Sequence, residues 1–315
     1  MARKAPRVLA IGDAIVDIVS PPLQGLPPGD VQGEVSGFAF LPGGNATNFA
    51  LQMASLGMRT TLVAAVGRDA FANRLRAAYR ARGVTARLRV DAKRPTGTTV
   101  ALTWADGRRA LITATGANAA LREADVPETL LASASHVHRA GFWWATGLLG
   151  APTERLLRRA QRAGASTSMD ISTDPQGWSR ARVDAVRVCL PHVDTFFGNG
   201  VEVCAVAGTR DPVRAAERLL EHGVSEVVLH RAEAGATWFR EGQRASLPAF
   251  RVPMDNPTGC GDVFNAGYLF TKLSGGTTEE ALGMGNALAA LHLRDRREPY
   301  PDLRELRAFV RVARA

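Results

Sequence analysis

Residues 255–267 read Asp-Asn-Pro-Thr-Gly-Cys-Gly-Asp-Val-Phe-Asn-Ala-Gly, and they place two glycines and an acid before an apolar segment typical of a helix over 263–273. Glycines just before a helix let backbone N–H groups turn toward a ligand, and the helix N-terminus adds partial positive charge. Because Asp262 would repel a phosphate, its better use is to accept a proton from a hydroxyl that attacks the phosphate. The stretch therefore indicates phosphoryl transfer to an alcohol. The alternative is a glycine-rich helix cap with Asp262 as a surface acid.

A second glycine motif lies far upstream. Residues 41–50 read Leu-Pro-Gly-Gly-Asn-Ala-Thr-Asn-Phe-Ala, where a short strand is expected to end and a helix to begin. Paired glycines followed by amides form a polar surface that a polyhydroxylated ligand can approach closely. Two such loops in this order are a more specific signal than either loop alone.

The two motifs together resemble the signatures of a known family. Residues 43–48 are similar to the N-terminal signature of the ribokinase/PfkB sugar and nucleoside kinases, and residues 258–262 are similar to their C-terminal signature. The resemblance runs from about Val8 to about Leu293, which is nearly the whole chain. It includes shorter elements at 12–17, 67–69 and 199–202.

The order of the expected elements favours an α/β fold. Segments typical of strands alternate with helical segments, and these strands are expected at 7–12, 60–66, 136–140, 167–170, 195–197 and 227–230. Such alternation specifies parallel strands with helices on both faces and ligands at the carboxyl ends of the strands. We expect one ribokinase-like domain over residues 1–315, with a doubly wound, mostly parallel sheet.

Two segments depart from this alternation. Residues 98–104 and 109–113 are typical of a hairpin around Ala105-Asp106-Gly107, and with 35–41 they are expected to form a small separate sheet. The resemblance implies that this sheet is a lid over the substrate, made of strands at about 31–41 and 97–114, and a possible homodimer surface. A second hairpin is predicted over 236–247.

The resemblance implies a role for the residues 259–262 of the glycine turn. Asp262 is the expected catalytic base, which takes the proton from the acceptor hydroxyl as that oxygen attacks the γ-phosphate of ATP. Gly259, Cys260 and Gly261 are expected to donate backbone N–H groups to the transferring phosphoryl. We interpret Cys260 as a small residue that fits the turn rather than as a nucleophile.

The acceptor is expected to bind at strand ends and at the first glycine motif. Carboxylates and amides there can bind vicinal hydroxyls and fix which hydroxyl faces the phosphate. The expected substrate-binding residues are Asp13, Asp17, Gly43, Gly44 and Asn48. A turn-capping acid is an equal alternative for Asp13, and a helix N-cap is the simpler interpretation of Asn45.

The resemblance also implies an ATP site, whose expected residues are Asn199, Glu202, His230, Gly235 and Asn286. Asn199 and Glu202 are similar to the family's Asn-x-x-Glu element, which organises Mg²⁺ and the nucleotide phosphates, with Glu202 acting on the metal partly through water. Asn286 lies in an alanine-rich helix and resembles a position that lines the adenine pocket. A surface asparagine is the alternative.

The chain departs from the family pattern at two positions. The usual Gly-x-x-Gly after the strand at 227–230 is replaced by Ala232 and Gly235, and alanine approaches a nucleotide closely only if its φ is negative. Many relatives carry an aspartate at position 256 that helps to bind an activating monovalent cation. Here that residue is Asn256 and Asp255 lies one position earlier, so K⁺ dependence is not assumed.

Composition restricts the partners and the compartment. The net charge of +9 comes mostly from arginines scattered along helix-like segments, without a basic tail or an aromatic-interleaved strand, so we do not expect nucleic-acid binding. The three cysteines show no metal-ligand spacing, which favours a reducing compartment. No segment approaches the ~20 apolar residues of a membrane span. We therefore expect a cytoplasmic protein that does not bind membranes.

Three functions follow from these observations. The first is an ATP-dependent kinase that phosphorylates a hydroxymethyl group of a free or modified sugar, and the second is a nucleoside kinase with the same chemistry. The third is a non-catalytic sugar or nucleotide sensor, against which the intact Asp262 argues. Arg108 and Arg109 are expected either to contact an anionic sugar or to form a solvated hairpin tip. Two alternatives remain for Phe142, Trp143 and Trp144: they stack on a ligand or they fill the core.

Overall fold

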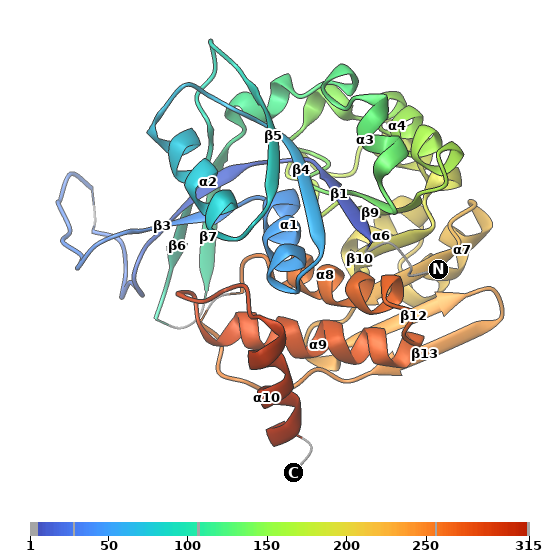
Figure 1. Cartoon of the computed structure of the whole chain (residues 1–315). Coiled ribbons are helices and arrows are strands. Elements are labelled where there is room, and N and C mark those ends of the chain that lie inside the picture. The colour runs from blue at the N-terminus through green and yellow to red at the C-terminus, as the bar shows by residue number, and fades with distance from the viewer. Residues whose placement is uncertain (1–5, 28, 106–107, 256, 314–315) are drawn as a thin grey trace.

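A nine-stranded sheet forms the centre of the computed structural model (Figure 1). The structure describes residues 6–27, 29–105, 108–255 and 257–313. Its strand order is β13-β12-β11-β10-β9-β8-β1-β4-β5. All neighbours from β11 to β5 are parallel, and β12 and β13 add an antiparallel edge. The strands are β1 (Arg7–Ile11), β4 (Arg59–Val66), β5 (Thr85–Val90), β8 (His136–Arg139), β9 (Ser166–Asp170), β10 (Thr195–Asn199), β11 (Glu226–His230), β12 (Ala236–Arg240) and β13 (Gln243–Leu247).

Helices cover both faces of this sheet because its strands are apolar on both sides. Leu9 and Ile11 of β1 join one buried cluster, while Val8 and Ala10 join the other. The first face is covered by α3 (Glu128–Ser133), α4 (Ala151–Arg162), α5 (Arg180–Arg187), α6 (Gly200–Ala207) and α7 (Pro212–Glu221). The second is covered by α1 (Asn45–Ser55), α2 (Ala70–Ala81), α8 (Cys260–Leu273), α9 (Thr278–Arg294) and α10 (Leu303–Ala313).

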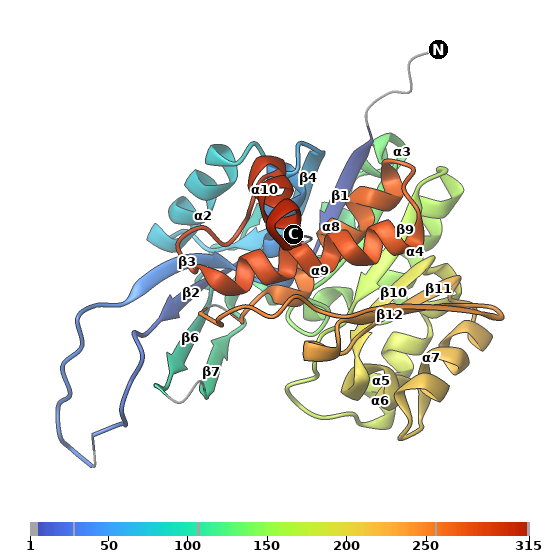
Figure 2. The same ribbon diagram turned by 90° about the horizontal axis from the view of Figure 1, so that it is seen from below.

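A second, four-stranded sheet stands apart from the first and forms the lid, with the order β3-β2-β6-β7 (Figure 2). Its strands are β2 (Ile15–Val19), β3 (Ala39–Gly43), β6 (Gly97–Thr103) and β7 (Arg109–Ala114). Strand β2 was not expected, because only three residues separate it from β1 and the two strands look like one interrupted apolar run. Asp17 therefore lies within a lid strand and not at the end of the first strand. Residues 31–38, expected as part of a strand, contain no regular structure.

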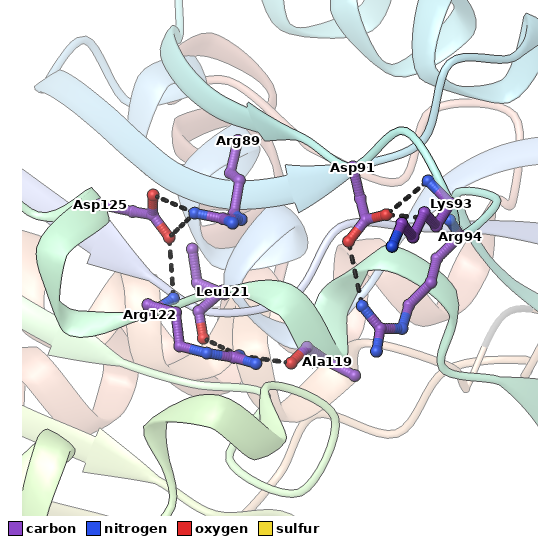
Figure 3. A network of polar contacts seen from close by, with 8 residues as sticks. All are labelled: Arg89, Asp91, Lys93, Arg94, Ala119, Leu121, Arg122 and Asp125. Carbon is purple, nitrogen blue, oxygen red and sulfur yellow. Dashed lines mark hydrogen bonds and ion pairs between the residues drawn. The ribbon is translucent and has the colours of Figure 1, made fainter.

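Strand β5 was also missed by the sequence analysis. It is an edge strand that pairs only with β4 among the described strands, and charged residues alternate along it, so it lacks the apolar run of its neighbours. Three polar contacts fix its end (Figure 3). Arg89 binds Asp125 at 3.0 Å, and the Asp91 carboxylate accepts the backbone N–H groups of Lys93 and Arg94 at 2.7 and 2.9 Å. These bonds set the direction in which the chain enters β6 of the lid.

The remaining sequence-based expectations agree with the structure. The helices expected to begin at the two glycine motifs are α1 and α8, and α8 contains the helix expected over 263–273. The hairpin expected over 236–247 is β12–β13, which is antiparallel. The tip of the lid hairpin includes residues 106–107, which lie outside the described residues. Among the described helices, none is both long enough and apolar enough to cross a bilayer.

Candidate active site

The two glycine motifs meet where α1 and α8 begin. Helix α1 follows Gly44, and α8 follows Gly259, whose backbone is left-handed with φ 86° and ψ 0°. A Cβ atom on Gly259 would lie 2.6 Å from Nδ2 of Asn48, so a side chain there would collide with the first motif. Glycine at 259 thus satisfies both the backbone conformation and the close approach.

Asp262 lies in the first turn of α8 and is held by two amides from α1. Nδ2 of Asn45 donates to Oδ1 at 3.0 Å, and Nδ2 of Asn48 donates to Oδ2 at 2.9 Å. Burial raises the pKa of Asp262 well above its usual value, the negative charge of Asp170 adds to this, and the two amides oppose it. A buried carboxylate with a raised pKa is a stronger proton acceptor than an exposed one. The surface-acid alternative is wrong, because the side chain is 2% exposed.

Asn45 is not the N-cap of α1. The N-cap is Gly44, and the side chain of Asn45 crosses to Asp262 instead. Asp13 does the capping from the end of β1: its Oδ1 accepts the N–H of Ala46 at 2.9 Å, and its carbonyl accepts the hydroxyl of Thr47 at 3.0 Å. Asp13 is fully buried, and its contacts are those of a capping acid. A contact of Asp13 with the acceptor stays a prediction.

A pocket lies between the inner face of the lid and the start of α1. Its lining includes Asp17, Leu41, Asn48, Leu111, Thr258, His292 and Tyr300. Burial and the nearby Asp13 raise the pKa of Asp17 to about 7, against a lowering by a hydrogen bond from Thr99. A Cβ atom on Gly43 would lie 2.2 Å from Oδ2 of Asp17, so the glycine leaves room for this carboxylate.

Tyr300 is a pocket residue that the sequence analysis did not name. Its hydroxyl lies 2.8 Å from Oδ1 of Asn48. Because Nδ2 of Asn48 must face the Asp262 carboxylate, Oδ1 faces Tyr300 and accepts its proton. Tyr300 thereby fixes the orientation of the amide that holds Asp262. No motif marks Tyr300, which lies beyond both glycine motifs in the chain.

The expected Asn-x-x-Glu element forms a reciprocal cap at the start of α6. The Asn199 N–H donates to Oε2 of Glu202 at 2.8 Å, and Nδ2 of Asn199 donates to Oε1 at 2.7 Å. Thr173 also donates to Oε1, at 3.0 Å. Burial and the charge of Asp170 raise the pKa of Glu202 to about 7. The carboxylate is thus fixed in place by neutral donors, and a role of Glu202 in binding Mg²⁺ stays a prediction.

Asp170 is a second missed residue, although the strand that carries it was expected to end there. Its Oδ2 accepts from Nδ2 of Asn265 at 2.6 Å, and Oδ1 of Asn265 lies 3.0 Å from Nε2 of His230. Since the carboxylate can only accept, Asn265 must turn its oxygen to His230, which therefore carries its proton on Nε2. Burial lowers the pKa of His230, and Asp170 opposes that lowering. An acid at the carboxyl end of a parallel strand was the available signal.

Asn286 and Gly235 lie beside the end of β13 and the residues that follow it. Asn286 is 5% exposed and donates to the carbonyls of Leu247 and Pro248 at 3.2 and 3.0 Å, so the surface alternative is wrong. A Cβ atom on Gly235 would lie 2.0 Å from the Leu247 carbonyl oxygen. Ala232 has a φ of +50°, the left-handed conformation that was expected to be unfavourable for alanine.

Three further expectations concern side chains near the turn and in the core. Arg109 of the lid donates to the Thr258 hydroxyl at 2.7 Å, so the hairpin reaches the glycine turn and is not merely a solvated tip. Burial raises the pKa of Cys260 to about 12, which keeps it a thiol and supports its interpretation as a small turn residue. Phe142 and Trp143 are 0% and 3% exposed and fill the core.

Comparison with known proteins identifies the class. Residues 5–298 match the model of the pfkB family carbohydrate kinases, and the chain belongs to that family. The protein is thus an ATP-dependent sugar kinase, a phosphotransferase with an alcohol group as acceptor.

Individual relatives lie at low sequence identity. A 2-dehydro-3-deoxygluconokinase of Thermoproteus tenax is 27% identical over 97% of this chain and 94% of its own length. A 5-dehydro-2-deoxygluconokinase of Photobacterium profundum is 24% identical over 82% of each chain. An E. coli structure described as ribokinase II in complex with ATP and Mg²⁺ superimposes with a TM-score of 0.85 at 23% identity, covering 98% of this chain and 100% of the other. The last likeness establishes the ribokinase-like fold.

Proposed function

We propose that the protein transfers the γ-phosphate of Mg²⁺-bound ATP to a hydroxymethyl group of a small sugar, with Asp262 as the general base. The observation that carries this proposal is the position of Asp262, buried at the N-terminus of α8 and held by Asn45 and Asn48. A hydroxyl placed beside this carboxylate gives up its proton as its oxygen attacks the phosphate. Backbone N–H groups of Gly259 to Gly261 then face the charge that develops on the phosphoryl group.

The acceptor lies in the pocket under the lid. Asp17 accepts hydrogen bonds from sugar hydroxyls, and Gly43 and Gly44 give the ligand access to the backbone beside it. Asn48 connects this pocket to the base, because it lines the pocket and donates to Asp262. A bound sugar would thus contact the same amide that holds the base, which couples acceptor position to proton transfer.

The nucleotide lies on the other side of the glycine turn. Glu202 and Asn199 would hold Mg²⁺ through water, and Mg²⁺ when bound would supply positive charge against the phosphates. His230, the last residue of β11, lies close to Gly261 of the turn, Gly235 follows it in the chain, and Asn286 lines the adenine side. Support for ATP and Mg²⁺ comes from the E. coli structure, which contains both.

An anionic sugar is the acceptor that the lid favours. Arg109 lies on the same face of the lid as Asp17 and Leu111, since alternate residues of a strand share a face, and its guanidinium reaches Thr258. Two relatives are named as kinases of dehydro-deoxygluconate sugars. A nucleoside kinase of Methanothermobacter thermautotrophicus is also similar, at 26% identity over 91% of this chain. The buried Phe142 and Trp143 do not supply the aromatic clamp that a nucleobase would favour.

The test is ADP release from Mg²⁺-ATP across pentoses, hexoses, sugar phosphates, sugar acids and nucleosides. Asp262→Asn is assayed beside wild type, with Asp30→Asn, an exposed acid of the β2–β3 segment, as the control. We expect turnover with one acceptor class, a loss of about 10²–10⁴-fold in Asp262→Asn, and wild-type rates in Asp30→Asn. Full activity of Asp262→Asn would contradict the role of this residue.

A further inference from the structure

Arg296 joins the segment after α9 to the residues that precede the glycine turn. Its Nε donates to Oδ1 of Asp255 at 2.9 Å, its Nη2 lies 2.7 Å from the same oxygen, and its backbone N–H donates to Oδ2 at 2.9 Å. The guanidinium also donates to two carbonyls, that of Asp255 at 3.1 Å and that of Ser20 at 3.4 Å. Three segments distant in sequence therefore converge on one positive charge.

The groups around this guanidinium form an all-oxygen set of one carboxylate and two carbonyls. Such oxygens are the ligands that hard cations prefer. The family resemblance implies a monovalent cation near position 256, and Asp255 was the acid that remained to bind it. Arg296 already neutralises that carboxylate and lowers its pKa. The residues present thus do not fit a cation site built on Asp255, because the guanidinium holds its oxygens. Residue 256 itself lies outside the described residues.

Further contacts tie the same two segments together beside Arg296. The N–H of Asp255 donates to the carbonyl of Leu293 at 2.7 Å. The ring of His292 lies between two carbonyls, with Nε2 2.7 Å from that of Thr258 and Nδ1 2.5 Å from that of Pro299. The end of α9 therefore supports the chain that leads into Gly259 and the base. A positive charge near a helix C-terminus is also favoured by the helix dipole.

We propose that Arg296 takes the place of an activating monovalent cation and is a positioning residue for the glycine turn. Its guanidinium is a permanent charge attached to the chain, so the turn is organised without an ion from solution. The enzyme then works equally well in potassium, sodium or an organic cation. The predicted activity in different cations rests on the proposed kinase function, whereas the predicted thermal stability does not.

The first experiment uses the wild-type chain in matched ionic strengths of KCl, NaCl and choline chloride. We expect initial rates that agree within about twofold and a thermal unfolding midpoint that does not depend on which cation is present. A rate in KCl about tenfold or more above that in choline chloride would overturn the proposal, as would a midpoint raised specifically by K⁺. The unfolding measurement decides the matter even if no acceptor is turned over.

The second experiment compares Arg296→Ala with Arg297→Ala, an exposed neighbour of equal charge whose backbone N–H binds Asp295. Removal of Arg296 leaves the turn less well positioned, so we expect a loss of kcat on the order of 10–10²-fold. Millimolar guanidinium or K⁺ is expected to restore the rate of Arg296→Ala and to raise its unfolding midpoint. Neither addition is expected to change Arg297→Ala. If Arg296→Ala keeps full activity without any small cation, or if both variants respond alike, the inference is wrong.

Discussion

Nδ2 of Asn48 lies 2.9 Å from Oδ2 of Asp262, although the two residues are 214 positions apart in the chain. The bond joins the first glycine motif to the second. Asn48 also receives the Tyr300 hydroxyl on its other side, so the amide has one orientation. Through Asn48 the pocket under the lid and Asp262 form a single hydrogen-bonded unit.

Replacement of Asn48 by alanine is therefore expected to change the pH dependence of the reaction. The amide donates to the ionised form of Asp262 and opposes the rise of its pKa, so its loss raises that pKa further. The base stays protonated to higher pH, and the acid limb of the kcat–pH profile moves to higher pH. Asn73→Ala, an exposed asparagine of α2, is the control. An acid limb that does not move would show that Asn48 has no effect on the pKa of Asp262.

Asp170→Asn is expected to move the same limb in the opposite direction. The charge of Asp170 raises the pKa of both Asp262 and Glu202, so its neutralisation lowers both. The measurement is again kcat against pH, with wild type, Asn48→Ala and Asp170→Asn assayed together. Shifts of the same sign in both variants would contradict this account of the electrostatics.

The sequence predicted most of the fold because the main strands and helices carry strong local patterns. Strand β2 was missed since its apolar residues look continuous with β1, and only the pairing with β3 and β6 distinguishes the two. The motifs included Asp262, Asn45 and Asn48 but not Tyr300 or Asp170. Tyr300 and Asp170 act through contacts across the fold, and such contacts leave no spacing signal in the chain. The capping role of Asp13 likewise became definite only from its bond to α1.

Asp17 is expected to lower the free energy of unfolding at the pH at which its ionised carboxylate would bind the acceptor. Its pKa is about 7 in the folded protein, above the usual 3.8, so the folded state holds this proton more tightly than the unfolded state does. The stabilisation that the raised pKa of Asp17 gives to the folded state is complete below the usual pKa of 3.8 and is lost as the pH rises through about 7. Asp17→Asn should raise the free energy of unfolding by on the order of 3 kcal/mol at pH 8 and little at pH 4, while KM for the acceptor rises. Urea unfolding at both pH values tests this, and an equal effect at both would refute it.

Ala232→Gly is expected to stabilise the protein. The left-handed backbone at φ +50° costs an alanine side chain about 1–2 kcal/mol, which glycine avoids, less the extra entropy of glycine in the unfolded chain. We expect a net gain of about 0.5–1 kcal/mol in the free energy of unfolding. Ala234→Gly in the same short turn lacks the positive φ and is the matched control, with a small loss expected. A loss in Ala232→Gly as large as in the control would exclude backbone strain at Ala232.

The outer face of the lid carries an apolar row that crosses all four strands. Phe40, Ile18, Val100 and Ile112 are register partners on adjacent strands, and Ile112 is 65% exposed. Pairing of this row with a second copy would bury it, as the predicted homodimer through the lid requires. Ile112→Glu is then expected to give monomers where wild type gives dimers in light scattering after size-exclusion chromatography. Arg87→Glu on β5, an exposed edge position of the main sheet, is the control and should leave the mass unchanged. A monomeric wild type would contradict the prediction directly, and a dimeric Ile112→Glu would place the contact elsewhere on the molecule.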